Sequence, residues 1–145
     1  MQQENKVPTG PKGELALRTL AMPANTNPAG DIFGGWIMSL MDLAAGLAGR
    51  EHANGRVVTA AVSRLSFLAP VRVGDAVCCY AHLTHTGRTS MVFEIETWIL
   101  PQRQRGQRVK VTEAEFTMVA VDDDGRPRLL APTSDAQAPV GGTKP

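Results

Sequence analysis

Hydrophobic positions along the chain form one helix-like run and several strand-like runs. The segment 36–50 (WIMSLMDLAAGLAGR) is rich in helix formers and has Ser39 and Asp42 as its only polar residues before Arg50. Segments rich in β-forming residues follow, separated by turn formers, at 56–68, 76–86, 90–100 and 107–121. A short apolar segment at 15–22 and a loop rich in Asn, Pro and Gly precede the helix. The pattern predicts a first strand, one helix and four long strands.

This order of elements is typical of an α+β domain, in which one helix packs on an antiparallel sheet. We place the domain at 15–130, between a flexible arm at 1–14 and a flexible tail at 131–145. The helix is apolar on nearly every side, and one face of a sheet cannot cover all of it. We therefore expect a second subunit to cover the remainder.

Composition narrows the class of protein. The 145 residues suffice for one core, and the net charge of +1 gives no basic footprint for nucleic acid. No stretch reaches the roughly 20 apolar residues of a membrane span, and the N-terminus lacks an apolar signal-peptide core. We therefore expect a cytoplasmic protein with no membrane partner. The adjacent Cys78 and Cys79 should point to opposite faces of a strand, so no disulfide is expected between them.

Asp42 is the polar position with the strongest chemical implication. Its helical neighbours at three and four residues are Met38, Ser39, Ala45 and Gly46, which offer little to pair with a carboxylate. An unpaired buried charge is costly, so a residue selected for stability alone would be apolar. The functional interpretation is a general base or a nucleophile. The alternative is a helix-surface contact or a structural salt bridge.

Two features before the helix fit the same chemistry. Gly34 and Gly35 could leave backbone N–H groups free at the helix N-terminus, where the oxyanion of acyl transfer would be stabilised. Asn27 carries an amide that can both donate and accept hydrogen bonds. Each has a simpler explanation, because a glycine pair can form a plain tight turn and an asparagine an Asx turn.

Other polar groups predict less. His82 and His85 should face opposite sides of a strand, and the acidic turn at 122–125 lacks the glutamate of a calcium loop, so no metal site is predicted. A basic cluster surrounds a turn and is either a solvated hairpin end or a site for a phosphorylated ligand. Its members are Arg103, Arg105, Arg108 and Lys110.

The segment NPAGDIFGGWIMSLMD, at 27–42, resembles the signature of the YciA-type acyl-CoA thioesterases, a family with the hotdog fold. The resemblance extends over about 17–128. Further matching motifs are RVVT at 56–59, FLAPVRVGD at 67–75, VCCY at 77–80, GRTS at 87–90 and TEAEFTMVAVD at 112–122.

This resemblance implies a long central helix wrapped by a five- to six-stranded antiparallel sheet, in dimers that assemble into a homohexamer, a trimer of dimers. It implies hydrolysis of acyl-CoA to CoA and a carboxylic acid, with no metal or cofactor beyond the CoA of the substrate. Asp42 would act as base or nucleophile, Asn27 of one chain would meet Asp42 of the other, and Gly34 and Gly35 would receive the carbonyl oxygen. Candidates for binding substrate and CoA are Thr59, Arg88, Ser90, Arg103, Arg105 and Arg108.

Two rival functions stay open. A hydratase or dehydratase of the same superfamily would need a histidine with an acidic partner, and the helix offers no histidine near Asp42. A non-catalytic acyl-CoA sensor would keep the CoA groove and lose the base, which the joint presence of Asp42 and Asn27 disfavours.

Overall fold

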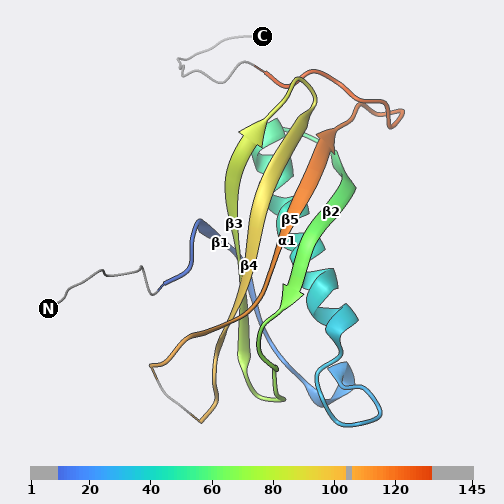
Figure 1. Ribbon diagram of the computed structural model, residues 1–145. Helices are drawn as coiled ribbons and strands as arrows, with labels where there is room; N and C mark the ends of the chain where they lie inside the picture. Colours follow the sequence, from blue (N-terminus) through green and yellow to red (C-terminus); the bar gives the residue numbers. More distant parts are fainter. Residues whose placement is uncertain (1–9, 104–105, 132–145) are drawn as a thin grey trace, which may run out of the picture.

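The computed structural model describes residues 10–103 and 106–131, and Figure 1 shows a sheet curved around one long helix. The elements in chain order are β1 (Glu14–Leu20), the 3-10 turn η1 (Pro23–Asn25), α1 (Gly34–Ala53), β2 (Val57–Phe67), β3 (Ala76–Thr86), β4 (Ser90–Leu100) and β5 (Val109–Ala120). The α+β prediction is confirmed, and each long strand lies within two residues of its predicted bounds. The arm predicted at 1–14 and the tail predicted at 131–145 lie mostly outside the described residues.

The helix α1 is longer than its sequence pattern predicts. It begins at Gly34, two residues before the predicted start, and ends at Ala53 rather than Arg50. Asn54 ends it in the left-handed conformation (φ 54°) that asparagine tolerates, and its N–H bonds to the Arg50 carbonyl. Arg128 donates to the Ala53 carbonyl at 2.9 Å, so a distant cation binds the exposed carbonyl end of the helix. No helix of the described residues is long and apolar enough to cross a membrane.

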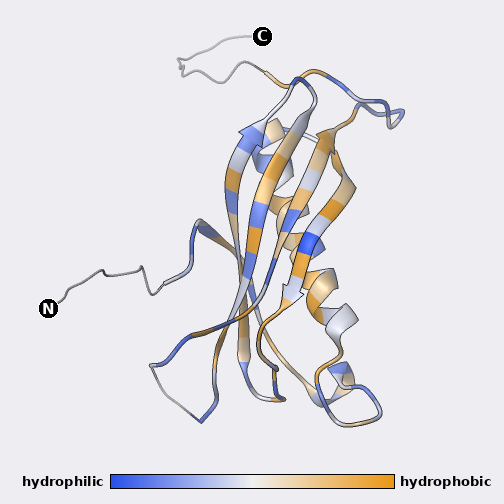
Figure 2. Ribbon diagram, viewed as in Figure 1, coloured by the Kyte–Doolittle hydropathy of each residue, from blue (hydrophilic) through white to orange (hydrophobic). Residues whose placement is uncertain are grey.

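All neighbouring strands of the five-stranded sheet pair antiparallel, in the order β1-β3-β4-β5-β2. The core lies between α1 and the concave face of the sheet. Apolar and polar positions alternate along β4 and β5, as Figure 2 shows. The largest fully buried side chains include Met41 of α1 and Met91, Ile95 and Met118 of the central strands. The sheet therefore covers one face of α1 with flexible and branched apolar side chains.

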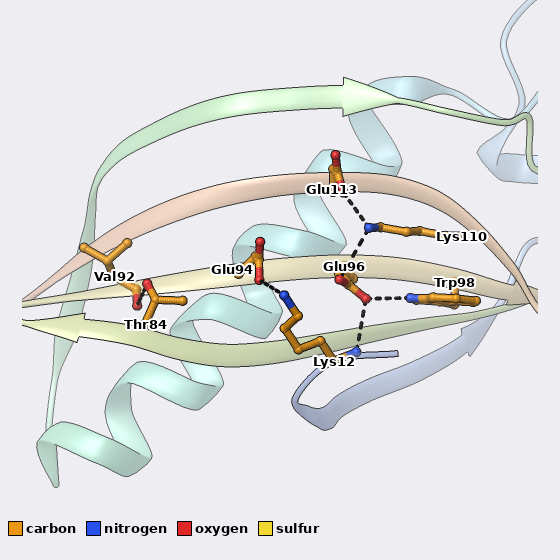
Figure 3. A network of polar contacts seen from close by, with 8 residues as sticks. All are labelled: Lys12, Thr84, Val92, Glu94, Glu96, Trp98, Lys110 and Glu113. Atoms are coloured by element: carbon orange, nitrogen blue, oxygen red, sulfur yellow. Dashed lines mark hydrogen bonds and ion pairs between the residues drawn. The ribbon is translucent and has the colours of Figure 1, made fainter. Parts of the chain in front are cut away.

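The outer face of the sheet, turned away from α1, carries a charged network (Figure 3). Glu96 is 5% exposed and accepts hydrogen bonds from the indole N–H of Trp98 at 2.9 Å and the backbone N–H of Lys12 at 3.2 Å. Lys110 lies 3.4 Å from the same carboxylate and also pairs with Glu113. Burial alone would raise the pKa of Glu96, but these hydrogen bonds and the charge of Lys110 outweigh it, so the pKa is lowered.

One face of α1 and the outer strand β2 have no cover in the single chain. Met38 and Leu43 of α1 are 40% and 55% exposed, and Val62 of β2 is 44% exposed. The outer edge of β2 is unpaired among the described strands, and two register shifts interrupt its pairing with β5. Arg64, which lies within the second of those shifts, adopts φ 56°. The sheet of this chain therefore covers only one face of α1, as the sequence predicts, and cover of the other face by a second subunit stays a prediction.

Candidate active site

Asp42 projects from α1 toward β2, where it meets Thr59. The Thr59 hydroxyl donates a hydrogen bond of 2.5 Å to Asp42 Oδ1. The expectation that Asp42 is a buried, unpaired carboxylate is wrong for this chain, because its side chain is exposed and its partner comes from β2 rather than from α1. Oδ2 has no hydrogen-bond or ion-pair partner among residues 10–103 and 106–131. That oxygen remains able to accept a proton.

An open groove of ≈ 1040 Å³ runs from Asp42 along α1 and the first half of β2. Its apolar part is formed by Leu43, Leu47, Val57 and Met118, and its charged part by Asp42, Arg50, Glu51 and Arg56. Sequence reasoning did not select Arg50 or Arg56. The signal for Arg50 was present, since it follows Asp42 by eight residues and so lies close to the same face of the helix.

The side chain of Asn27 organises the loop before α1. Its Oδ1 accepts hydrogen bonds from the N–H groups of Ala29 at 2.9 Å and Asp31 at 3.1 Å. The Asx-turn interpretation is therefore confirmed for this residue. The two N–H bonds of its amide point to no partner within the described chain, so Asn27 can still donate. Asn27 does not line the groove of Asp42, so one chain does not bring the two residues into a common pocket.

Gly34 and Gly35 form the first turn of α1, under two aromatic rings. A side chain at Gly35 would meet the Phe33 ring at 2.8 Å, and one at Gly34 would meet the Phe67 ring at 3.4 Å. Neither glycine has a positive φ, so close approach of the rings, not backbone conformation, explains them. Their N–H groups have no hydrogen-bond acceptor in the described part of the chain, whereas those of Trp36 and Ile37 bond to the Phe33 carbonyl. The glycine pair therefore presents free donors.

The candidate CoA-binding residues divide between opposite ends of the sheet. Arg88 lies in the tight β3–β4 turn, closed by a hydrogen bond of 2.8 Å from Gly87 to the carbonyl of Ser90. Arg103 and Arg108 flank the β4–β5 turn. The 11 residues of β4 separate the two turns by more than about 30 Å. Arg105 lies outside the described residues. Of the five candidates that the structure describes, only Thr59 lines the groove of Asp42.

The two cysteines lie buried in β3, away from the groove of Asp42. Cys78 and Cys79 are both free and buried, and they face opposite sides of β3, as expected. Cys78 Sγ lies 3.2 Å from Arg18 Nε, while Cys79 contacts Thr97 on the inner face. Burial raises the pKa of Cys79 to about 11, which leaves it unreactive near neutral pH. Residues 10–103 and 106–131 contain no group of three or more His, Cys, Asp or Glu residues that could hold a metal.

Comparison with known proteins decides the family. The model of the thioesterase superfamily matches residues 29–105. The acyl-CoA thioester hydrolase YciA of Salmonella typhimurium is 56% identical over 122 residues, which are 83% of this chain and 92% of the relative. The chain belongs to the thioesterase superfamily. At this identity and coverage, its place within that superfamily is among the YciA-type acyl-CoA thioester hydrolases.

Solved structures share the fold. The hexameric thioesterase y2039 of Yersinia pestis is 55% identical, with a TM-score of 0.81 over 83% of this chain and 98% of that one. An acyl-CoA hydrolase of Staphylococcus aureus, solved with butyryl coenzyme A and coenzyme A, is 28% identical, with a TM-score of 0.72 over 79% and 69% of the two chains. Two further structures of that hydrolase carry an asparagine-to-alanine and an aspartate-to-alanine substitution. The hotdog fold expected from the sequence is confirmed.

Proposed function

We propose that this protein hydrolyses the thioester of acyl-CoA to free CoA and a carboxylic acid, with Asp42 as the reacting carboxylate. The observation that carries the proposal is the exposed Asp42, held by Thr59 at one end of an open groove of ≈ 1040 Å³ that continues along α1 to Asn54. Membership of the YciA-type thioester hydrolases supports the same substrate class.

In the proposed reaction, Oδ2 of Asp42 takes a proton from a water molecule, whose oxygen forms the new bond to the thioester carbonyl carbon. Thr59 occupies Oδ1 and so fixes which oxygen faces the water. When the tetrahedral intermediate collapses, the C–S bond breaks, and the proton passes from Asp42 to the CoA sulfur. Direct attack by the carboxylate, through a mixed anhydride, uses the same placement and remains the alternative. Neither route requires a metal or a cofactor.

The free N–H groups of Gly34 and Gly35 suit the negative oxygen of the intermediate, because they lie at the positive end of the α1 dipole. Asn27, with its amide donors unpaired, would position the water or the thioester. We infer that Asn27 acts on Asp42 of a partner chain. In the Staphylococcus aureus hydrolase, the substituted asparagine and aspartate are as far apart along the chain as Asn27 and Asp42 are here.

The uncovered face of α1 and the free edge of β2 support assembly. Pairing of two β2 edges would bury Val62 and would bring the loop of one chain toward the groove of the other. The relatives named above include a hexameric thioesterase, and we propose a hexamer, a trimer of dimers, for this chain as well. The cytoplasmic location expected from the sequence remains a prediction.

The test of the site measures thiol release from a series of acyl-CoA substrates. Asp42→Asn should lower kcat by roughly 10²- to 10⁴-fold, the usual contribution of a positioned base. Asp124→Asn, which changes an exposed carboxylate in a surface turn, is the matched control. Near-wild-type turnover by Asp42→Asn would contradict the assignment, and tight CoA binding by a wild type without turnover would favour the sensor.

The shared site has its own test. Asp42→Asn and Asn27→Ala proteins, each nearly inactive, should recover activity when they are unfolded, mixed and refolded together. Mixed dimers would contain one site with both native residues. Absence of recovery, despite mixed dimers seen by native mass spectrometry, would place both residues of a site in one chain.

A further inference from the structure

The groove beside Asp42 contains two arginine side chains without a carboxylate partner. Arg50 of α1 and Arg56 at the start of β2 both line it, and neither forms an ion pair with a described residue. Nη1 of Arg56 donates to the backbone carbonyls of Asp122 and Asp123, at 3.4 and 3.3 Å. These contacts fix the guanidinium and leave its other N–H donors available, since arginine has five. The groove therefore contains two arginines with N–H donors available to a ligand, of which Arg56 is held by backbone carbonyls.

The spacing suits a ligand that reacts at Asp42. Arg50 follows Asp42 by eight residues, or about 12 Å along the helix axis. Arg56 lies immediately before β2 and precedes Thr59 by three residues, or about 10 Å of extended chain. Along the backbone, Arg50 is thus about 12 Å from Asp42 and Arg56 about 10 Å from Thr59, its hydrogen-bond partner, and both arginines line the same groove. An extended arm the length of pantetheine can span that distance.

No described carboxylate forms an ion pair with either arginine. Glu51 lines the groove and a second cavity as well, and it is not paired with Arg50 or Arg56. The negative end of the α1 dipole lies nearby. Arg128 binds the Ala53 carbonyl there, and its guanidinium lies over Gly55, where a Cβ would meet it at 2.6 Å. That third arginine balances the helix terminus and leaves Arg50 and Arg56 for a ligand.

We propose that Arg50 and Arg56 bind the phosphate groups of CoA, while the pantetheine arm runs along the groove to Asp42. The inference rests on the proposed function for its choice of ligand. Arginine matches phosphate oxygens with paired, charge-assisted hydrogen bonds, which a single lysine cannot reproduce. The sequence suggested Arg88, Arg103 and Arg108 for this role instead, but none of these three residues lines the groove.

The experiment compares Arg50→Gln, Arg56→Gln and the double variant with Arg126→Gln. Arg126 is an exposed arginine of the neighbouring turn and does not line the groove, so it controls for a general loss of positive charge. Arg50→Lys and Arg56→Lys keep the charge and lose the paired geometry. The substrates are butyryl-CoA and the butyryl thioester of N-acetylcysteamine, which lacks phosphate. Circular dichroism and thermal unfolding establish that each variant is folded.

Each Gln variant should raise KM for butyryl-CoA about tenfold or more, as expected when a charged hydrogen bond is lost. The ratio of kcat/KM between butyryl-CoA and the truncated thioester should fall by the same factor, with partial recovery in the Lys variants. A change below about twofold, an equal loss on both thioesters, or a larger effect of Arg88→Gln than of the double variant would overturn the proposal.

Failure of the proposed thioester hydrolysis can be distinguished from failure of the assignment of Arg50 and Arg56. If the wild type releases no thiol from either substrate, thioester hydrolysis is refuted, but the arginines can still be tested by titrating CoA into Asp42→Asn in a calorimeter. Adding Arg50→Gln and Arg56→Gln to that protein should weaken CoA binding about tenfold or more, and unchanged binding would refute their role.

Discussion

Removal of the Thr59 hydroxyl is the most direct test of how Asp42 is held. Thr59→Val keeps the branched shape of the side chain and deletes the donor that lies 2.5 Å from Asp42 Oδ1. Thr59→Ser keeps the donor and removes a methyl group. The pair separates the hydrogen bond from the packing of β2.

The size of the effect follows from the kind of bond. A hydrogen bond to a charged group contributes about 1.5–3 kcal/mol, and each 1.36 kcal/mol is a factor of ten in rate. Because Thr59 is exposed in the groove, water can replace part of the lost bond, so the lower end applies. We expect Thr59→Val to lower kcat by about tenfold, and Thr59→Ser to retain most of the activity.

The assay is thiol release from an acyl-CoA at several concentrations, so that kcat and KM are obtained separately. If Thr59 positions the carboxylate, the loss appears in kcat and is rescued by serine. A raised KM at wild-type kcat would instead support the role in substrate binding expected from the sequence. Equal losses in Thr59→Val and Thr59→Ser would refute the hydrogen bond as the cause.

Three further outcomes follow from the structure. Because the pKa of Glu96 is lowered, its ionised form stabilises the fold above the unfolded-state pKa, and that stability is lost as the pH falls below 4.5. The free energy of unfolding in urea should therefore depend less on acid pH in Glu96→Gln than in the wild type. An equal pH dependence in the two proteins would contradict this. Thr112→Val should leave the melting temperature unchanged or raise it, because the buried Thr112 hydroxyl has no partner among the described residues, whereas Thr97→Val, which loses a contact to Cys79, should lower it. Val62→Lys should reduce the oligomer in sedimentation velocity without loss of secondary structure, and an unaltered oligomer would show that this edge of β2 is not an interface.

The sequence pattern was sufficient to predict the helix and the strands, because apolar periodicity and turn residues are local properties. It underestimated α1 at both ends. Gly34 and Gly35 resemble loop residues, and the helix terminus at Ala53 depends on Asn54 and on Arg128, which is far along the chain. Such long-range capping leaves no local signal.

The site was predictable in its residue types but not in its contacts. Asp42 stood out as a polar residue in an apolar helix, yet its partner Thr59 is 17 residues away on another element. Which of the nine exposed arginines in the described part of the chain share a groove with Asp42 depends on the register of β2 against α1. For that reason the sequence suggested turn cations such as Arg88 and Arg103 and not Arg50 and Arg56.

The irregular backbone of β2 affects which other chains can pair with its free edge during synthesis. A straight, unpaired edge strand is a template on which any newly made extended segment can add, and such addition leads to aggregates. The two register shifts and the left-handed Arg64 bend β2 along its length. Full-length pairing therefore requires a strand with matching bends, which a second copy of the same chain provides. The distortion thus favours self-recognition during synthesis over adhesion to unrelated chains.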